Sequence, residues 1–262
     1  MLSVLVMLLL PQRWLGYLLS FGLLFLVNSY LAAHVHLSAT HLLTAWGLQI
    51  AALVVLQSLV SYWLHRLEHA VPALWALHQF HHSADRMTLM TSARGTQFLK
   101  GIEMGIVFVP MALLTQPTLP TPAFGTAGFV VVVAYFIYHI AVSTNGYLAH
   151  SNLDTDYGWV GRWLIVSPHM HRLHHATEAR YHDKNFGNDV VIWDRLFGTY
   201  VRCDPTQDPA SVPIGLEQNP FNRRDSLLGS VQEYFITTLV VFWRELNRGR
   251  TASRRGQLVA PT

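Results

Sequence analysis

The hydrophobic pattern of the first half of the chain consists of long apolar runs separated by short polar linkers. Four such runs follow one another, at residues 14–33, 42–64, 102–119 and 123–143. A helix needs about 20 consecutive apolar residues to cross a bilayer, and the third run is the weakest because it contains Glu103. Since the linkers at 33–41 and 116–122 are short, we expect about four transmembrane helices in two hairpins.

From residue 145 onward, polar turns alternate with short apolar stretches, such as 159–166. We expect residues 1–144 to form the membrane part, 145–247 a cytoplasmic helical cap, and 248–262 a disordered tail, with 1–247 acting as a single functional domain. Residues 230–243 carry an apolar stripe flanked by arginines, which fits either an interfacial helix or a helix packed in the cap. The predicted fold class is all-α.

The lysines and arginines orient the predicted spans. Of the 18 in the chain, one precedes the first span, four lie within 65–100, none lies within 101–161, and 13 follow from Arg162 onward. Basic residues concentrate on the cytoplasmic side of membrane proteins, so we expect both termini and the segment 65–100 to be cytoplasmic. The N-terminus lacks a charged region and a small-residue cleavage site, so we do not interpret it as a removable signal peptide.

The composition is that of a membrane protein and disfavours several other classes. Hydrophobic residues make up 51% of the chain and charged residues 13%, outside the usual range of soluble domains. The net charge of +3 comes without a nucleic-acid-binding motif, so we expect attraction to anionic lipid and no nucleic-acid partner. The single cysteine, Cys203, excludes an internal disulfide framework and a thiolate zinc cluster. Metal binding must therefore rest on histidine and carboxylate.

Histidines cluster in three motifs, HRLEH, HQFHH and HRLHH, and a further histidine follows the fourth apolar run. Helical spacings of three and four residues place the histidines of each motif on one face, and imidazole is the commonest protein ligand for first-row transition metals. The candidate metal ligands are His65, His69, His78, His81, His82, His150, His171, His174 and His175. Nine ligands exceed what one four-coordinate zinc uses, so we predict a two-metal site rather than scattered structural histidines.

These three motifs resemble the histidine boxes of the fatty acid hydroxylase and sterol desaturase superfamily, and DKNFGNDVVIWDRLFGTY resembles the segment that follows the last box. The match covers residues 62–200 and includes the order and spacing of the boxes. The resemblance implies a membrane-embedded, non-haem di-iron enzyme that uses O2 as co-substrate, with a four-helix membrane part and a cytoplasmic cap that holds the metals. It also implies a separate electron donor, a ferredoxin or a cytochrome b5-like protein with its NAD(P)H-dependent reductase, because the sequence contains no redox cofactor motif.

The eight box histidines match positions of the family pattern, and His150 matches the extra ligand between the second and third boxes. One departure is Gly146, where some members have a paired histidine, so one metal is expected to have fewer protein ligands. His139 lies eleven residues before His150, about 16 Å along one continuous helix, and we expect it not to be a ligand. Five other histidines are expected to be bystanders: His34, His36 and His41 at the opposite membrane surface, and His169 and His182 in the cap.

Polar residues next to the boxes are candidates to orient the imidazole rings by accepting their second N–H. They are Glu68, Asp85, Asp183, Asn185, Asn188 and Asp194. Helix capping and turn formation are the competing roles for each of them. We expect the aromatic residues Trp193, Phe197 and Tyr200 to pack the cap rather than to contact substrate.

The sequence thus predicts an integral-membrane monooxygenase that hydroxylates a lipid, such as a fatty acyl chain, a sterol, a carotenoid or a polar lipid. Desaturation at the same site is the alternative reaction. A histidine-rich metal transporter or metal-binding protein is the alternative of another class, but its ligands are expected near mid-bilayer. We expect the substrate to enter from the bilayer, along polar positions such as Gln49, Gln57, Ser58 and Ser61, unless these serve helix–helix hydrogen bonds.

Overall fold

The computed structural model describes residues 46–89, 91–95, 126–204 and 206–219, with isolated residues near 103, 106, 221 and 239–247. The predicted span at 14–33, nearly all of the span at 102–119, most of 230–243 and the tail at 248–262 lie outside the described residues. The described part is mainly helical, and its pairings outside helices are two isolated bridges, Ile165 with Val190 and Ala176 with Ile214. This agrees with the predicted all-helical character.

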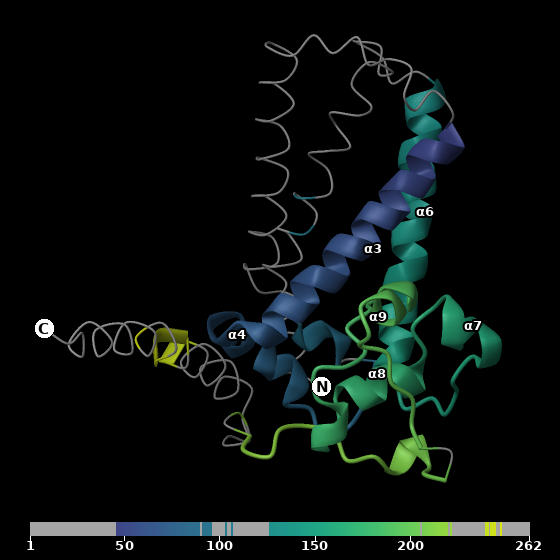
Figure 1. Cartoon of the computed structure of the whole chain (residues 1–262). Coiled ribbons are helices and arrows are strands. Elements are labelled where there is room, and N and C mark those ends of the chain that lie inside the picture. Colours follow the sequence, from purple (N-terminus) through teal and green to yellow (C-terminus); the bar gives the residue numbers. More distant parts are fainter. Residues whose placement is uncertain are drawn as a thin grey trace, which may run out of the picture.

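Two long helices pack against each other and lead into the cap (Figure 1). Helix α3 covers Trp46–Ala70 and helix α6 covers Thr126–Ala149. Within the described residues, one helical stretch, Ile50–Ala70 of α3, is long and apolar enough to cross a membrane. Helix α3 continues six residues past the apolar run predicted to end at residue 64, and this extension carries the first histidine motif. The arrangement in four spans stays a prediction.

Helix α4 covers Pro72–His82 and folds back against α3. The break between the helices is local: Val71 precedes a proline and has extended backbone angles, and Pro72 then occupies the first turn of α4, where its missing N–H costs nothing. At the C-terminal end of α4, the half-buried Arg94 donates to the carbonyl oxygen of Phe80 at 3.2 Å and to Ser83 Oγ. Burial lowers the pKa of Arg94 to about 10. The turn from α3 to α4 therefore brings the first two motifs together.

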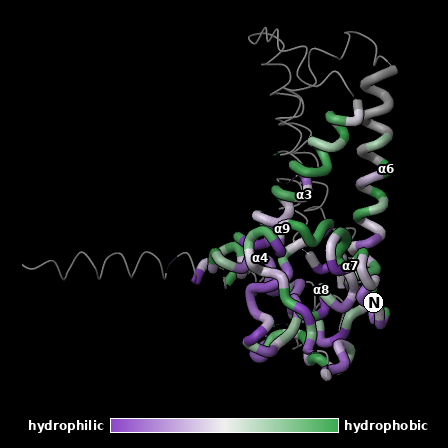
Figure 2. The backbone as a smooth tube through the Cα atoms, turned by 45° about the vertical axis from the view of Figure 1, so that its right-hand side comes forward, coloured by the Kyte–Doolittle hydropathy of each residue, from purple (hydrophilic) through white to green (hydrophobic). Residues whose placement is uncertain are grey.

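The cap consists of short helices joined by turns, and Figure 2 shows its mixed hydropathy beside the apolar α3 and α6. Helix α7 covers Gly158–Trp163, α8 covers Pro168–His174 and α9 covers Ile192–Leu196. Single 3-10 turns lie at Ser92–Arg94 (η1), Ala179–Tyr181 (η3) and Pro209–Ser211 (η4). Helix α8 begins at a capping serine, Ser167, whose hydroxyl accepts from the Met170 amide at 3.2 Å.

Helix α8 divides the cap core from the histidines. Met170 packs with Ala149, Val166 and Val191 in one apolar cluster, and Leu173 packs with Tyr181 in another. The helix also carries His171 and His174 of the third motif, and both are buried. The apolar contacts of α8 therefore fix the position of the helix and its rotation about its own axis. This rotation sets the direction in which its imidazoles point.

Polar side chains of α3 attach the cap to this helix. Ser58 Oγ accepts from Trp193 Nε1 at 3.0 Å and Ser61 Oγ accepts from Asn188 at 3.0 Å. Gln57 donates to Glu103 at 2.5 Å. These contacts support hydrogen bonding between elements as the role of these three positions, the alternative to a polar substrate path. The side chain of Gln49 lies outside the described residues.

Candidate metal centre

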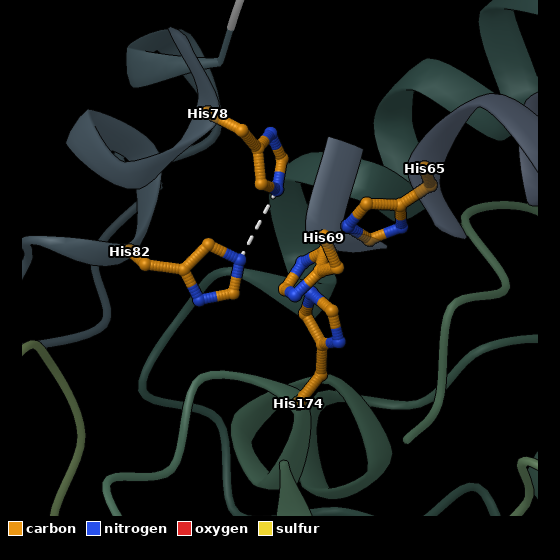
Figure 3. A group of neighbouring side chains, drawn as sticks. All are labelled: His65, His69, His78, His82 and His174. Carbon is orange, nitrogen blue, oxygen red and sulfur yellow. Dashed lines mark hydrogen bonds between the residues drawn. The ribbon is translucent and has the colours of Figure 1, made fainter. Parts of the chain in front are cut away.

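All nine predicted ligand histidines lie in two adjacent groups, each with ring nitrogens within 4.8 Å of one another. We call the first the five-histidine cluster; it comprises His65, His69, His78, His82 and His174. Figure 3 shows its rings pointing toward a common centre from three helices. We call the second the four-histidine cluster; it comprises His81, His150, His171 and His175. No other group of this kind occurs among the residues that the structure describes.

The helical spacing explains how the second and third motifs each serve both clusters. In α4, His78 and His82 are four residues apart and face the five-histidine cluster, whereas His81 is turned toward the other one. In the third motif, His171 and His175 share the four-histidine cluster, and His174 faces the five-histidine cluster. Positions four residues apart lie on one helix face, and the intervening position is rotated away. Helix α3 contributes only to the five-histidine cluster, and the end of α6 only to the four-histidine cluster.

Backbone carbonyls hold three of the rings by their Nδ1 atoms. His65 Nδ1 lies 2.8 Å from the carbonyl oxygen of Phe186, and His174 Nδ1 lies 2.8 Å from that of Lys184. His150 Nδ1 lies 2.6 Å from the carbonyl oxygen of Gly146. A carbonyl oxygen can only accept, so Nδ1 carries the proton in each ring and Nε2 is left as a lone-pair donor. The Nε2 atoms of His65, His69 and His174 are buried without a hydrogen-bond partner.

The spacing of the ring nitrogens fits a bound metal. In the four-histidine cluster, His150 Nε2 lies 3.0 Å from His81 Nε2 and 2.7 Å from His171 Nε2. Because Nδ1 of His150 holds the proton, its Nε2 presents a lone pair to both neighbours, and a cation placed between the three nitrogens would be stabilised there. Imidazole nitrogens bound at about 2.1 Å to one metal are roughly 3 Å apart in neighbouring positions. The donor set therefore fits a transition metal in each cluster.

Burial keeps these imidazoles in the form that binds metal. Desolvation lowers the pKa of His81, His82, His171 and His175 well below its usual value, and the nearby imidazoles lower it further. Desolvation also lowers the pKa of His174 to about 3, against the opposing effect of its bond to the Lys184 carbonyl. The rings are therefore neutral near pH 7, as metal coordination requires.

Three of the six predicted ring-orienting residues lie where they can hold a cluster histidine, two beside its ring and one through the backbone. Glu68 Oε2 lies 3.3 Å from His78 Nδ1, and the exposed Asp183 lies 3.9 Å from His69 Nδ1. Asp194 acts through the backbone: its buried carboxylate accepts from the amides of Phe186 and Gly187 at 2.8 Å each. The Phe186 carbonyl in turn accepts from His65.

The other three have different contacts. Asn185 donates to the carbonyl oxygens of Met170 and Val201 and accepts from the Val201 amide, so it ties the cap backbone together. Asn188 donates to Ser61 of α3. Asp85 is exposed, and its charge acts on Arg94. In the described residues these three side chains thus take up the competing structural roles rather than contacting an imidazole.

The remaining histidines lie outside both clusters or outside the described residues. His169 pairs with Asp154 at 2.5 Å, and the exposed His182 donates to the Thr177 carbonyl at 3.0 Å. The side chain of His139, and the whole of His34, His36 and His41, are not among the described residues.

Several residues next to the clusters carry no motif that sequence reasoning could use. The ring of Trp75 lies 5.1 Å from that of His69 and 5.3 Å from that of His82, between centroids. At Gly187 an added Cβ would lie 2.6 Å from the Val190 carbonyl oxygen and 2.8 Å from Asp194 Oδ2. Thr199 donates to Asp194 at 2.7 Å and contacts the Tyr62 hydroxyl. Of these residues, only Gly187 has a signal in the sequence, because a glycine in this segment indicates a close approach of the backbone.

Comparison with known proteins places this site in a family. The family model described as fatty acid hydroxylase matches residues 50–199. Alkylglycerol monooxygenase of Xenopus tropicalis is 30% identical over 53% of this chain and 28% of its own length, and that of Danio rerio is 31% identical over 60% and 31%. Ornithine lipid hydroxylase OlsE of Rhizobium tropici is 30% identical over 64% of this chain and 45% of its own length.

The chain therefore matches less than half of the length of each of these relatives. No solved structure matches it. The family match covers more than half of the chain and includes the histidine motifs with the segment that follows them. The chain therefore belongs to the fatty acid hydroxylase family.

Proposed function

We propose that the protein is a membrane-bound, non-haem di-iron monooxygenase that uses O2 to hydroxylate a lipid. The observation that carries this proposal is the convergence of nine imidazoles, eight of them buried and one half-buried, into two adjacent clusters of ring nitrogens. A structural zinc site uses four ligands and leaves no second cluster beside it. Imidazole-rich sites suit iron, zinc, copper and nickel, and among these iron also fits an oxygenase family.

The nine histidines would hold the two ions, five at one and four at the other. Bound there, two iron ions would supply the oxidising power to insert one oxygen atom of O2 into an unactivated C–H bond. In balance, the substrate gains that oxygen atom, while two electrons and two protons reduce the second oxygen atom to water. The electrons must come from outside the chain, and we propose a ferredoxin or a cytochrome b5-like protein with its NAD(P)H reductase.

The residues of the chain have three tasks in this proposal. The carbonyls of Phe186, Lys184 and Gly146 fix the proton of His65, His174 and His150 on Nδ1, so that Nε2 can coordinate. Burial keeps the rings neutral and excludes water from the centre. Glu68 places a carboxylate beside His78, where it can hold the ring and increase its basicity, as carboxylates next to metal-bound histidines do.

The proposed substrate is a lipid that reaches the centre from the membrane. Two relatives are named for lipid substrates, an alkylglycerol and an ornithine lipid, and a third is named a fatty acid hydroxylase. His65 and His69 lie in the last two turns of α3, so the five-histidine cluster is next to the end of the apolar stretch. An acyl chain that stays in hydrocarbon avoids a cost of roughly 0.8 kcal/mol for each CH2 exposed to water.

We also propose four transmembrane helices with the metal centre on the cytoplasmic side. The distribution of basic residues supports this orientation, since none lies within 101–161 and 13 follow from Arg162 onward. A cytosolic reductant would then have access to the cap.

The test combines metal analysis with product analysis. Protein purified without oxygen should contain two iron ions per chain and consume O2 when reduced. Expression in a host supplied with ¹⁸O2 should yield a lipid heavier by one labelled oxygen atom. His174→Ala should lose this product and lose metal, whereas His169→Ala, a half-buried position of the same helix outside both clusters, should behave like the unmodified protein.

Each alternative gives a different result. Loss of two hydrogen atoms from the lipid, without added oxygen, would assign a desaturase. Bound metal without O2 consumption in the reduced protein would favour a metal-binding protein or a transporter. Full metal content and full turnover in His174→Ala would contradict the assignment of the centre.

A further inference from the structure

Large apolar side chains are exposed together on one side of the cap. They come from α7 and the residues just after it, and from α9 with its C-terminal neighbour. We call this surface the α7–α9 face; it comprises Trp159, Val160, Trp163, Leu164, Ile165, Ile192, Leu196 and Phe197. Trp159 and Leu196 are 65% and 66% exposed. Water-exposed apolar groups of this size normally mark a surface that contacts something else.

The two segments form one continuous surface rather than two separate patches. A bridge joins Ile165 to Val190, just before α9. Arg195 donates to the carbonyl oxygen of Arg162 at 2.7 Å, and its guanidinium lies 3.9 Å from the centre of the Trp163 ring. These contacts hold α7 and α9 side by side, so the exposed apolar groups are presented as a unit.

The α7–α9 face is next to the helix that can cross a membrane. Trp193 donates to Ser58 of α3, and the Phe197 ring lies 5.3 Å from that of Tyr62 and 5.0 Å from that of Trp63. Trp63 is itself exposed. In Figures 1 and 2, α7 and α9 lie on the side of the cap from which α3 and α6 emerge. The exposed apolar surface of the cap therefore continues the apolar surface of α3.

We propose that the α7–α9 face lies in the interfacial layer of the same bilayer that α3 crosses. Continuity with α3 selects this occupant, because a surface that adjoins a membrane-crossing helix borders the lipid headgroups. The residue types agree: tryptophans and arginines gather at membrane interfaces, and a short segment with an apolar face and flanking basic residues lies in the plane of the interface. Arg162 and Arg195 would then lie at the level of the headgroups, and Trp159 and Leu196 would lie deeper, toward the acyl chains.

The inference rests on the proposed membrane crossing of α3 and adds a second point of attachment, in the cap. Two attachments restrict the tilt of the cap on the membrane and keep the metal centre at a constant height above the acyl chains. This role differs from metal binding, since none of the eight residues of the face belongs to either cluster.

The test measures the depth of single positions in the full-length protein. In a Cys203→Ser background, one cysteine at a time replaces Leu196, Trp159, Val55 or Ala179 and receives a nitroxide spin label in phosphatidylcholine nanodiscs. Val55, exposed on α3, is the reference within the membrane, and Ala179, exposed in η3, is the reference in water. Collision rates with O2, which concentrates in lipid, are compared with those with a water-soluble nickel chelate.

We expect the labels at Leu196 and Trp159 to collide several times more with O2 than with the nickel chelate, as at Val55, and the label at Ala179 to do the reverse. Labels at Leu196 and Trp159 that behave like Ala179, while Val55 remains in lipid, would overturn the inference and leave the membrane crossing intact. A water-exposed Val55 would contradict the crossing itself. Spin–spin broadening at Leu196 that disappears on dilution with unlabelled protein would assign the face to a second copy of the chain.

Discussion

The two histidine clusters share helices α4 and α8 but differ in number of ligands and in surroundings. The five-histidine cluster has a carboxylate beside His78 and another near His69. In the four-histidine cluster, the Nδ1 atoms of His81 and His175 are buried without a hydrogen-bond partner in the described part of the chain, and His150 is held by a backbone carbonyl. Because it has one imidazole fewer, the four-histidine cluster would leave more of the coordination sphere of a bound metal open to other ligands.

The comparison shows how the same spacing can yield unequal sites. Gly146, four residues before His150, offers only its carbonyl oxygen, which accepts from His150 Nδ1 and fixes the proton there. Negative charge stabilises a cation at the five-histidine cluster, whereas the four-histidine cluster relies on neutral imidazoles alone. We therefore expect the five-histidine cluster to bind a metal more tightly and the four-histidine cluster to leave its metal more accessible to other ligands.

The largest expected effect is the loss of His150. His150→Ala leaves three imidazoles in the four-histidine cluster and should reduce the iron content from two ions per chain to about one, with no detectable turnover. Iron per chain and ¹⁸O incorporation into lipid measure the two effects. A variant that keeps both ions would contradict the expectation that three imidazoles are too few to hold iron in this cluster. His182→Ala, an exposed histidine of the cap, is the matched control.

The five-histidine cluster should be sensitive to charge instead. Glu68→Gln keeps an acceptor next to His78 but removes the negative charge, and loss of such an outer partner typically lowers metal affinity by about 10–100-fold. Titration of the reduced protein with a chelator would show one ion released early and the other unchanged. Glu178→Gln, whose carboxylate pairs with Arg180 at the surface, should leave both ions in place. If Glu68→Gln released the ion of the four-histidine cluster first, the charge of Glu68 would not act on the five-histidine cluster as expected.

Sequence spacing predicted all nine members of the clusters and a two-metal site, but not which histidine belongs to which cluster. The members could be predicted because the histidines of each motif are three or four residues apart, which gathers them on one side of a helix. The division depends on the angles at which α4 and α8 meet α3 and α6, which depend on packing partners such as Met170 and Leu173. Helical spacing alone cannot supply those angles.

The partners of the rings were harder to predict for another reason. Phe186 and Lys184 contribute backbone carbonyls, which every residue type has, so their side chains carry no signal. Asp183 and Asn185 have positive φ angles of 55° and 57°, a conformation that short polar residues tolerate. This turn directs the Asn185 side chain to the cap backbone, whereas proximity in sequence to the third motif had suggested an imidazole.

A smaller effect is expected from Gly187, which directly follows Phe186, the residue whose carbonyl oxygen accepts from His65. In Gly187→Ala the new methyl group would approach the Val190 carbonyl oxygen and Asp194 closely, and overpacking of this kind costs roughly 1–3 kcal/mol. The shift should displace the Phe186 carbonyl and thereby His65, so metal loss is expected from that cluster alone. Thermal unfolding in detergent gives the stability, with Gly47→Ala as control because open space surrounds that position. Equal stability of the two variants would contradict this account.

The smallest expected effect comes from the attachment of the cap to α3, a helix that serves only the five-histidine cluster. Trp193→Phe removes the bond from Nε1 to Ser58 Oγ and should cost about 0.5–1.5 kcal/mol. Ser58→Ala removes the same bond together with the bond from Ser58 to the Val55 carbonyl, so it should cost at least as much. If the contact is direct, the double variant will be less stable than Ser58→Ala by at most a few tenths of a kcal/mol. If the two losses of unfolding free energy were fully additive, the two residues would act separately. The contacts of Phe197 and Asn188 with α3 would then have to keep His174 facing His65.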